Sequence, residues 1–403
     1  MGMNSTPSGE RVHISFFGRR NAGKSSVLNA VTGQELAVVS DVKGTTTDPV
    51  MKSMELLPLG PVVMIDTPGI DDEGELGALR VKKSYQILNK TDVAVLVADA
   101  SVGFGDAEEA LLAKIQEKRI PCVVVWNKAD LVSGQAEGPD GGSHGVIHVS
   151  AATGQGIDEL KERLARLGKP EENGRRIIAD LLSPGDTVVL VVPIDKAAPK
   201  GRLILPQQQT IRDILEADAF SLVVRETGLK AALGQRREKP RLVVTDSQAF
   251  KKVAADTPAD IPLTSFSILF ARYKGELLPM VQGVKALDGI QDGDRILICE
   301  GCTHHRQCDD IGTVKMPGWI RAYTGASPDF AFVSGTEFPD DLSPYRMIVH
   351  CGGCMLNARE MRYRLQCAQD QGVPMTNYGM TIAHTQGILK RSLEPFEELR
   401  GIL

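Results

Sequence analysis

Short apolar runs alternate with longer amphipathic stretches along the first part of the chain. The apolar runs predict strands at residues 12–17, 62–65, 93–98, 122–126 and 146–149, and a helix is predicted at 25–31. Strands that alternate with helices form a mostly parallel sheet with helices on its faces. Residues 1–168 are therefore expected to form an α/β domain.

The same alternation resumes after a polar linker at residues 168–176. Residues 175–262 are predicted to hold strands at 188–193, 220–224 and 242–245, with helices at 208–216 and 229–236. This segment contains no cysteine and no histidine, so we interpret it as a scaffold or subunit-contact domain. Residues 263–403 form a third segment, with strands predicted at 295–299 and 346–349 and a helix at 357–368.

Composition narrows the class of protein. The 403 residues carry a net charge of −5, with 42% hydrophobic and 24% charged residues, as in ordinary globular proteins. Since there is no excess of Lys and Arg to neutralise phosphates, no nucleic-acid partner is expected. No apolar run approaches the ~18 residues of a membrane span, and the N-terminus lacks a signal-peptide pattern. We therefore expect a cytoplasmic protein with no membrane partner.

A phosphate-binding pattern lies between the first predicted strand and helix. Residues 18–25 fit the spacing of a glycine, four residues, then Gly-Lys-Ser. The glycines allow backbone amides to face phosphate oxygens, and the following helix points its positive end at the same place. Lys24 is expected to reach the β- and γ-phosphates, and Ser25 to bind Mg²⁺. The expected nucleotide contacts in this loop are Asn21, Ala22, Gly23, Lys24, Ser25 and Ser26.

Two further segments are typical of the nucleotide-sensing parts of a GTPase. Thr46, in the polar stretch 41–48, is expected to contact Mg²⁺ and the γ-phosphate. Asp66, after a predicted strand, is expected to hold Mg²⁺ through water, and the Gly69 amide to sense the γ-phosphate. With Lys24, these three residues form the expected catalytic group.

The sequence Asn-Lys-Ala-Asp at residues 127–130 indicates that the base is guanine. Asp130 can accept two hydrogen bonds from N1 and N2 of guanine, a donor pair that adenine lacks, and an unpaired buried polar group makes the wrong base costly. The ligands are therefore expected to be GTP and GDP. The other residues expected in the guanine pocket are Asn127, Lys128, Ser150, Ala151 and Ala152.

Together these motifs resemble the translation-factor-type small GTPases over the whole first domain. Many regulatory members carry a glutamine that orients the attacking water, where this chain has Ile70, so slow hydrolysis is expected. The sequence of residues 21–26 and the Gly-Thr-Thr switch resemble those of the potassium-activated branch of GTPases related to MnmE. That resemblance implies a K⁺ ligand at Asn21, with K⁺ replacing an arginine finger. From the residues alone, Asn21 could equally cap the loop.

Five of the seven cysteines lie in residues 299–354. Two groups, at 302–304 and 350–354, each follow a predicted strand, and carboxyl ends of strands are the usual ligand position in an α/β sheet. In a reducing compartment such clustering indicates metal ligands. Three cysteines and a histidine suit tetrahedral zinc, whereas three cysteines with an open fourth position suit a 4Fe-4S cluster. The candidate ligands are Cys302, His304, His350, Cys351 and Cys354.

A GTPase of this branch, a middle α/β domain and these two cysteine groups together resemble the FeFe-hydrogenase maturation GTPases, the HydF family, over the full chain. The resemblance implies a 4Fe-4S cluster on Cys302, Cys351 and Cys354, with His304 and His350 near the exchangeable fourth iron site. It implies a middle dimerisation domain, and hence a homodimer or a higher oligomer. It also implies a carrier that receives a di-iron precursor from radical-SAM maturases and delivers it to apo FeFe-hydrogenase, with GTP regulating partner association.

The expected fold is therefore α/β throughout. It comprises an N-terminal P-loop GTPase domain (1–168), a small middle α/β dimerisation domain (175–262) and a C-terminal α/β iron–sulfur cluster domain (263–403). An alternative from another class is a tRNA- or ribosome-associated GTPase with a structural zinc site. The acidic balance and the lack of a basic patch studded with aromatic residues count against it.

Overall fold

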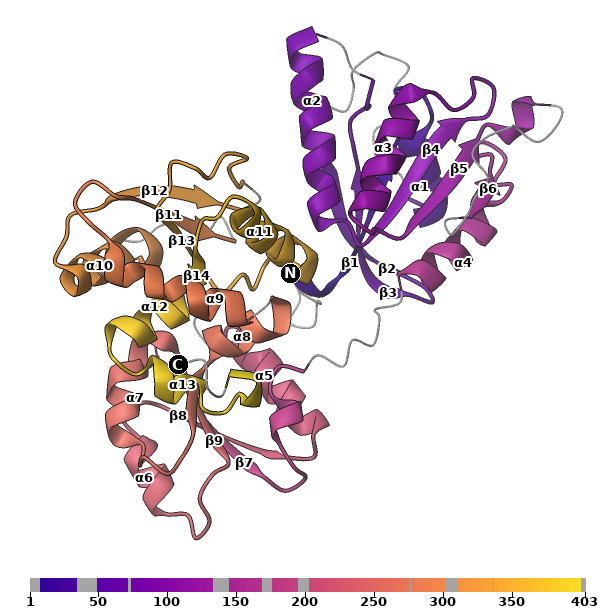
Figure 1. Ribbon diagram of the computed structural model, residues 1–403. Coiled ribbons are helices and arrows are strands. Elements are labelled where there is room, and N and C mark those ends of the chain that lie inside the picture. The colour runs from indigo at the N-terminus through magenta and orange to yellow at the C-terminus, as the bar shows by residue number, and fades with distance from the viewer. Residues whose placement is uncertain are drawn as a thin grey trace. The chain divides into compact units, whose positions relative to one another are not determined.

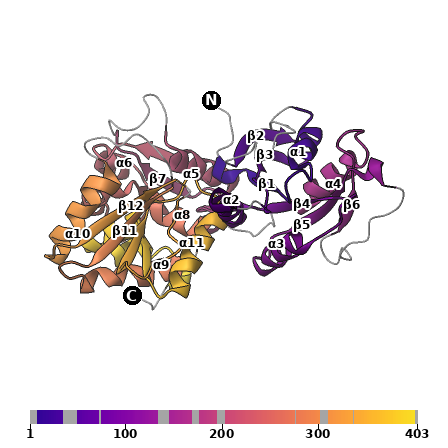
Figure 2. The same ribbon diagram turned by 90° about the horizontal axis from the view of Figure 1, so that it is seen from above.

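The computed structural model describes residues 8–34, 49–71, 74–132, 145–168, 176–194, 203–275, 277–301, 310–335 and 337–399. The chain divides into two compact units, residues 1–173 and 174–403. In both views of the chain, the strands of each unit lie between helices (Figures 1 and 2). Every helix in the described ranges is too short or too polar to span a bilayer.

The first unit is built on one sheet. Its strands are β1 (Val12–Phe17), β2 (Val50–Leu56), β3 (Gly60–Asp66), β4 (Val93–Asp99), β5 (Cys122–Asn127) and β6 (Val146–His148). Its helices are α1 (Lys24–Thr32), α2 (Gly74–Ile87), α3 (Asp106–Glu117) and α4 (Ile157–Leu167). Within the described residues the strand order is β2-β3-β1-β4-β5-β6, and every neighbouring pair is parallel except β2 with β3.

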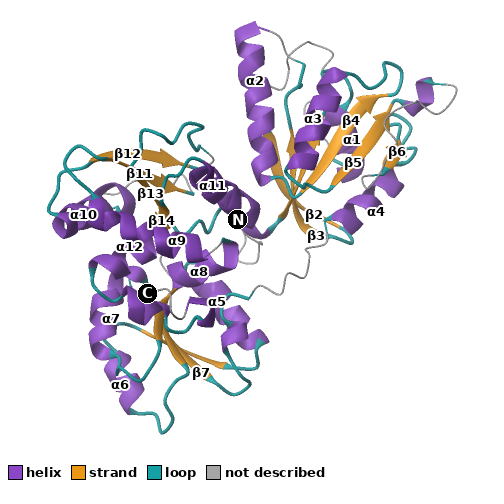
Figure 3. Ribbon diagram, viewed as in Figure 1, coloured by secondary structure: helices purple, strands orange, loops and turns teal. Residues whose placement is uncertain are grey.

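Helices cover both faces of this sheet (Figure 3). Successive side chains of a strand point to opposite faces. Phe16 of β1 therefore packs in the cluster formed with α1 and α4, whereas Phe17 packs in the cluster formed with α2 and α3. Burial on both faces explains the continuous apolar runs that predicted these strands. The predicted strands and helix are confirmed within two residues, but β2 was missed because most of its side chains are exposed.

The second unit holds two sheets. The strands of one are β7 (Thr187–Val191), β8 (Phe220–Val224), β9 (Leu242–Thr245) and β10 (Leu263–Ser265), and those of the other are β11 (Arg295–Glu300), β12 (Asp329–Ser334), β13 (Met347–His350) and β14 (Met375–Asn377). The helices are α5 (Leu205–Glu216), α6 (Leu229–Gly234), α7 (Phe250–Asp256), α8 (Phe266–Lys274), α9 (Leu277–Val284), α10 (Met316–Thr324), α11 (Ala358–Asp370), α12 (Tyr378–Thr385) and α13 (Leu389–Leu393). Within the described ranges, both sheets are parallel, in the orders β10-β9-β7-β8 and β12-β11-β13-β14.

One hydrophobic core runs through both sheets of the second unit, from Val189 of β7 to Ile348 of β13. The strands and helices predicted for residues 188–245 and 295–368 are confirmed within three residues. β10 pairs with β9, so the first of these sheets continues past residue 262, where we expected the middle domain to end. A three-residue strand gives too short an apolar run to be recognised in a sequence.

The packing of α9 against β14 depends on Gly283. A Cβ at this position would lie 2.1 Å from the backbone carbonyl oxygen of Met375. Because a backbone atom cannot turn aside, Gly283→Ala is expected to destabilise the second unit by about 1–3 kcal/mol. Gly234 of α6 is the matched control, since a Cβ there meets nothing within 4 Å. Urea unfolding should show a lower midpoint for Gly283→Ala and no loss for Gly234→Ala; equal midpoints would contradict this close contact.

Candidate functional site

The glycine-rich loop between β1 and α1 folds around its own lysine. Lys24 Nζ, in the first turn of α1, donates to the carbonyl oxygens of Gly18 (3.0 Å) and Arg19 (2.8 Å). Gly23 has φ 86°, and a Cβ on it would lie 2.2 Å from Asn127 Nδ2, so only glycine fits. The loop therefore ends at the positive end of α1, where phosphate oxygens bind favourably.

Ser25 and Asp66, both predicted to hold Mg²⁺, are in direct contact. Ser25 Oγ donates to Asp66 Oδ2 at 2.6 Å. Burial raises the pKa of Asp66, and the hydrogen bond from Ser25 and the charge of Lys24 oppose that rise only in part. The other carboxylate oxygen, Oδ1, is buried and has no hydrogen-bond partner among the described residues. Such an oxygen suits Mg²⁺ or a water bound to it, so these residues fit the ion. Thr46 lies outside the described residues.

Gly69 lies against the phosphate-binding loop. A Cβ on Gly69 would lie 2.6 Å from Arg20 Cγ. Asp71 also contacts this loop, because its Oδ1 accepts a hydrogen bond from the Arg20 amide at 2.7 Å. Ile70 is buried in the core, so its side chain does not face a nucleotide. The segment after β3 therefore contacts the loop that is predicted to bind the γ-phosphate. The predicted sensing role of Gly69 requires such a contact.

Asn127, at the end of β5, joins the phosphate-binding loop to the loop after β6. Its Nδ2 donates to the Ala22 carbonyl oxygen at 2.9 Å, and its Oδ1 accepts from the Ala151 amide at 3.1 Å. Lys128 has φ 62° and pairs with Asp99 at the end of β4, with 2.5 Å between Nζ and Oδ2. The predicted guanine residues thus follow two adjacent parallel strands. Asp130 and Ala152 are exposed, Ala151 is half-buried and Ser150 is buried.

Asn21, the candidate K⁺ ligand, lies at the exposed edge of the phosphate-binding loop. It adopts φ 61°, a left-handed conformation that asparagine tolerates better than most residues. Ser26, also predicted to contact nucleotide, is half-buried in the first turn of α1. The structure therefore gathers the described nucleotide-site residues around one loop, with Asn21 accessible to an ion.

The second candidate site is the loop of residues 351–356, here called the cysteine loop, which follows β13. β11 and β13 are neighbours, with Cys299 opposite His350, so the two strands end at the same edge. Cys351 Sγ accepts hydrogen bonds from the amides of Gly301 (3.0 Å) and Gly353 (3.3 Å). Backbone N–H groups directed at sulfur stabilise a thiolate and tune the metal that it binds.

The cysteine loop fits a thiolate-bound metal. Gly353 has φ 61°, and a Cβ on it would lie 2.6 Å from Met361 Sδ, so the loop can curl only with glycine there. Cys351 and Cys354 are both half-buried free thiols. Burial raises the pKa of Cys351 to about 11 despite its two amide donors, so the free thiol stays protonated until a metal displaces the proton. Cys122 and Cys299 are buried in the core.

Cys302 and His304 lie outside the described residues. Within the ranges that are described, no three His, Cys, Asp or Glu side chains gather as a metal site. The complete set of predicted ligands therefore stays a prediction, of which the structure describes His350, Cys351 and Cys354.

His350 is fully buried, and both of its ring nitrogens have partners. Its Nε2 lies 3.0 Å from Arg364 Nη1, and its Nδ1 lies 2.8 Å from the Cys351 carbonyl oxygen. Arginine can only donate, so Nε2 accepts and the proton sits on Nδ1. Burial and the charge of Arg364 lower the pKa of His350 to about 3, which keeps the ring neutral. In this arrangement His350 orients the start of the cysteine loop, and direct metal ligation would require loss of its bond to Arg364.

Three family models match the chain. One, described as a 50S ribosome-binding GTPase, matches residues 13–128. The hydrogen maturase F dimerization domain matches residues 177–275, and the hydrogen maturase F tetramerization domain matches residues 276–395. The first unit is therefore a P-loop GTPase domain, as predicted, and the second carries domains named for oligomerization.

Each curated relative matches a smaller part of the chain than the three family models do together. The tRNA modification GTPase MnmE of Synechococcus sp. (strain JA-3-3Ab) is 41% identical over 169 residues, which are 40% of this chain and 36% of the relative. MnmE of Laribacter hongkongensis is 35% identical over 156 residues, 38% of this chain and 34% of the relative. GTPase Der of Wolinella succinogenes is 34% identical over 184 residues, 43% and 38% of the two chains. The chain thus spans about a third of the length of these relatives.

Asp130→Asn tests the guanine pocket. The substitution removes the carboxylate that accepts from guanine, so GTP binding should weaken by on the order of 10²-fold while binding of xanthosine triphosphate improves. Asp158→Asn is the matched control, since Asp158 is an exposed aspartate of α4 whose side chain pairs only with Lys161 among the described residues. Titration with both nucleotides measures the change. A variant that still prefers GTP would contradict the assignment of residues 127–130.

Proposed function

Since the chain belongs to the hydrogen maturase F family, we propose that it is a GTP-hydrolysing scaffold that holds a 4Fe-4S cluster and delivers a di-iron precursor to apo FeFe-hydrogenase. The observation that carries the proposal is the cysteine loop, in which two backbone amides face the Cys351 sulfur beside the end of β11. Cluster chemistry and delivery go beyond the family assignment and are our proposal.

Cys302, Cys351 and Cys354 would hold the cluster as thiolates. When bound, a cluster with three cysteine ligands supplies one iron with an exchangeable coordination position. His304 belongs to the same group of predicted residues, and His350 would act near that iron from its place between Arg364 and the cysteine loop. The chain's own part is to keep the sulfurs at one edge of the sheet and to donate amide hydrogen bonds to them.

GTP and Mg²⁺ would bind in the first unit. Lys24 would exchange its two carbonyl partners for phosphate oxygens, and Ser25, Asp66 and Thr46 would hold Mg²⁺. Hydrolysis would be slow because Ile70 is buried and no glutamine follows Gly69. K⁺ at Asn21 would supply the missing positive charge, and the nucleotide state would regulate association with radical-SAM maturases and hydrogenase.

The protein would act as a homodimer or a higher oligomer in the cytoplasm. Residues 177–275 and 276–395 match domains named for dimerization and tetramerization, which supports self-association. The alternative is a tRNA- or ribosome-associated GTPase with structural zinc. Two matched relatives are named as tRNA modification GTPases, and one family model is described as ribosome-binding. A net charge of −5 counts against it.

Potassium dependence is tested with Asn21→Ala. GTP hydrolysis by the wild-type protein should be about tenfold or more faster in K⁺ than in Na⁺, because a positive charge in the arginine-finger position is worth on the order of 10³–10⁵ in rate. In Asn21→Ala the two salts should give the same slow rate, with GTP affinity retained. Equal rates in both salts for the wild-type protein would remove the potassium hypothesis and leave GTP binding intact.

Division of labour between the two sites gives a second test. Cys351→Ser should abolish or cripple the cluster, because serine stays protonated where a metal-bound cysteine is a thiolate, and should leave GTP turnover unchanged. Lys24→Ala should lose GTP turnover and keep the cluster. Cys367→Ser is the matched control, since Cys367 is a half-buried thiol of α11 outside the cysteine loop.

Iron content, GTP turnover and hydrogenase activation should be measured on all three variants. We expect Cys351→Ser and Lys24→Ala to fail in activation for separate reasons, and Cys367→Ser to retain every activity. Normal activation by Cys351→Ser would show that the cysteine site is not the carrier site.

A further inference from the structure

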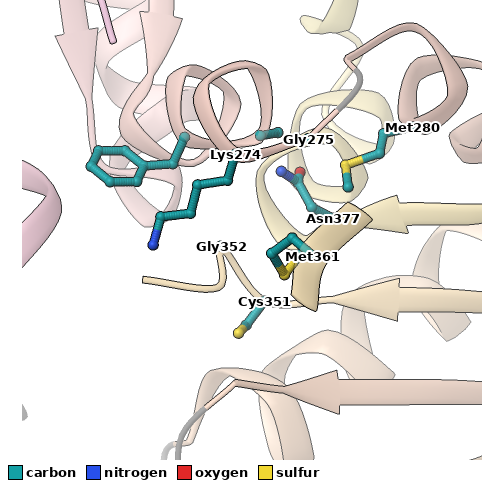
Figure 4. Close-up of a pocket in the computed structure, with 9 residues that line it drawn as sticks. Lys274, Gly275, Met280, Cys351, Gly352, Met361 and Asn377 are labelled. Carbon is teal, nitrogen blue, oxygen red and sulfur yellow. The ribbon is translucent and has the colours of Figure 1, made fainter. Parts of the chain in front are cut away.

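Lys274, the last residue of α8, is buried next to the cysteine loop. Lys274 is only 2% exposed, and most other residues of its helix are apolar. Lysine is almost never fully buried unless it is paired, because removing a charge from water is costly. Figure 4 shows the Lys274 side chain reaching toward the loop that carries Cys351 and Gly352.

Lys274 Nζ donates to three backbone carbonyl oxygens of the cysteine loop: Gly353 (3.1 Å), Cys354 (3.1 Å) and Leu356 (2.8 Å). Three N–H donors on one nitrogen are a property of the ammonium form of lysine. Hydrogen bonds from a charged donor are roughly twice as strong as neutral ones. The ammonium therefore draws these carbonyls toward a single point and fixes the path of the loop.

This contact is linked to the sulfur of Cys351 through Gly353. Gly353, whose carbonyl oxygen is held by Lys274, donates its own amide to Cys351 Sγ. Lys274 and Cys351 line the same small pocket, whose other walls include the apolar side chains of Phe270, Met280 and Met361. In such surroundings a fixed charge acts on a neighbouring thiolate more strongly than it would in water.

Besides bonds between its own residues, the loop has an anchor that lies far away in sequence. Lys274 lies within residues 177–275, which match the dimerization domain, whereas the cysteine loop lies within residues 276–395, which match the tetramerization domain. A contact across about eighty residues of chain thus joins the two parts at the candidate metal centre.

We infer that Lys274 is a positioning residue for the metal centre. It holds the cysteine loop in the shape that presents Cys351 and Cys354 together, and it places an ammonium group at the backbone carbonyls of the loop that carries both sulfurs. This inference rests on the proposed function, since it requires that the loop binds a cluster. A positive charge favours the more negative, reduced form of a cluster, so Lys274 raises the reduction potential.

Lys274→Met, Lys274→Gln and Lys274→Arg separate the two effects. Methionine keeps an unbranched apolar stem and loses the charge and all donors, glutamine keeps amide donors without charge, and arginine keeps both. Arg391→Met is the matched control, because Arg391 likewise donates to three backbone carbonyls, those of Ala254, Thr257 and Pro258, in the same unit. Circular dichroism shows whether each variant folds.

The full-length variants should be reconstituted anaerobically with iron and sulfide and assayed for iron content. A redox titration of the cluster, followed by EPR, then gives its reduction potential. We expect less iron in Lys274→Met than in the wild-type protein. In Lys274→Met and Lys274→Gln the ratio of reduced to oxidised cluster at a fixed potential should fall about tenfold, which is about 59 mV for one electron. Lys274→Arg should restore the wild-type potential, and Arg391→Met should keep both iron content and potential.

Wild-type iron content and potential in Lys274→Met would overturn the inference while the proposed function stands. Should Lys274→Met fail to fold, Lys274→Gln decides, and an unchanged potential in that variant overturns the inference equally. A wild-type protein that takes up no cluster would overturn the proposed function first, and this inference with it. An equal loss of iron in Arg391→Met would show that any lost anchor has this effect, and would also overturn the role of Lys274.

Discussion

Parallel pairing of strands determines where both candidate sites lie. In a parallel sheet the carboxyl ends of neighbouring strands meet at one edge, and the loops that leave them come together. In the first unit β1, β3 and β5 deliver Lys24, Asp66 and Asn127 to such an edge. In the second unit β13 delivers the cysteine loop beside the end of β11. A shift of one residue in this register would turn His350 and its neighbours to the opposite face.

Buried polar groups then give each edge its chemical character. Asp66 keeps a carboxylate oxygen that has no partner among the described residues, and Lys274 keeps an ammonium against backbone carbonyls. Burial and the charge of Arg364 lower the pKa of His350 and keep it neutral, with one ring nitrogen directed to the cysteine loop. Buried polar groups cost free energy in a core unless protein groups or a bound ligand pair with them. The first unit thereby suits a magnesium nucleotide, and the second suits a metal bound by thiolates.

Much of the fold followed from the sequence because burial on both faces leaves continuous apolar runs, as for β4 and β7. β2, β10, β12 and β14 were missed. β2 is largely exposed, β12 has no fully buried side chain, and β10 and β14 are only three residues long. The phosphate-binding loop was predictable because its contacts lie within a few residues, as in the bond from Lys24 to Gly18. Lys274 lies about eighty residues from the cysteine loop that it bonds, and His350 and Arg364 lie on different elements. No local sequence pattern encodes either contact. Thr46, Cys302 and His304 lie outside the described residues, and their roles stay predictions.

Metal analysis of the wild-type protein tests most directly whether one chain combines a GTPase domain with an iron–sulfur site. Protein purified without oxygen should be analysed for iron, acid-labile sulfide and zinc in the same sample. We expect about four iron and four sulfide per chain, the content of one 4Fe-4S cluster, with little zinc. About one zinc per chain without sulfide would contradict an iron–sulfur site and favour a structural metal site.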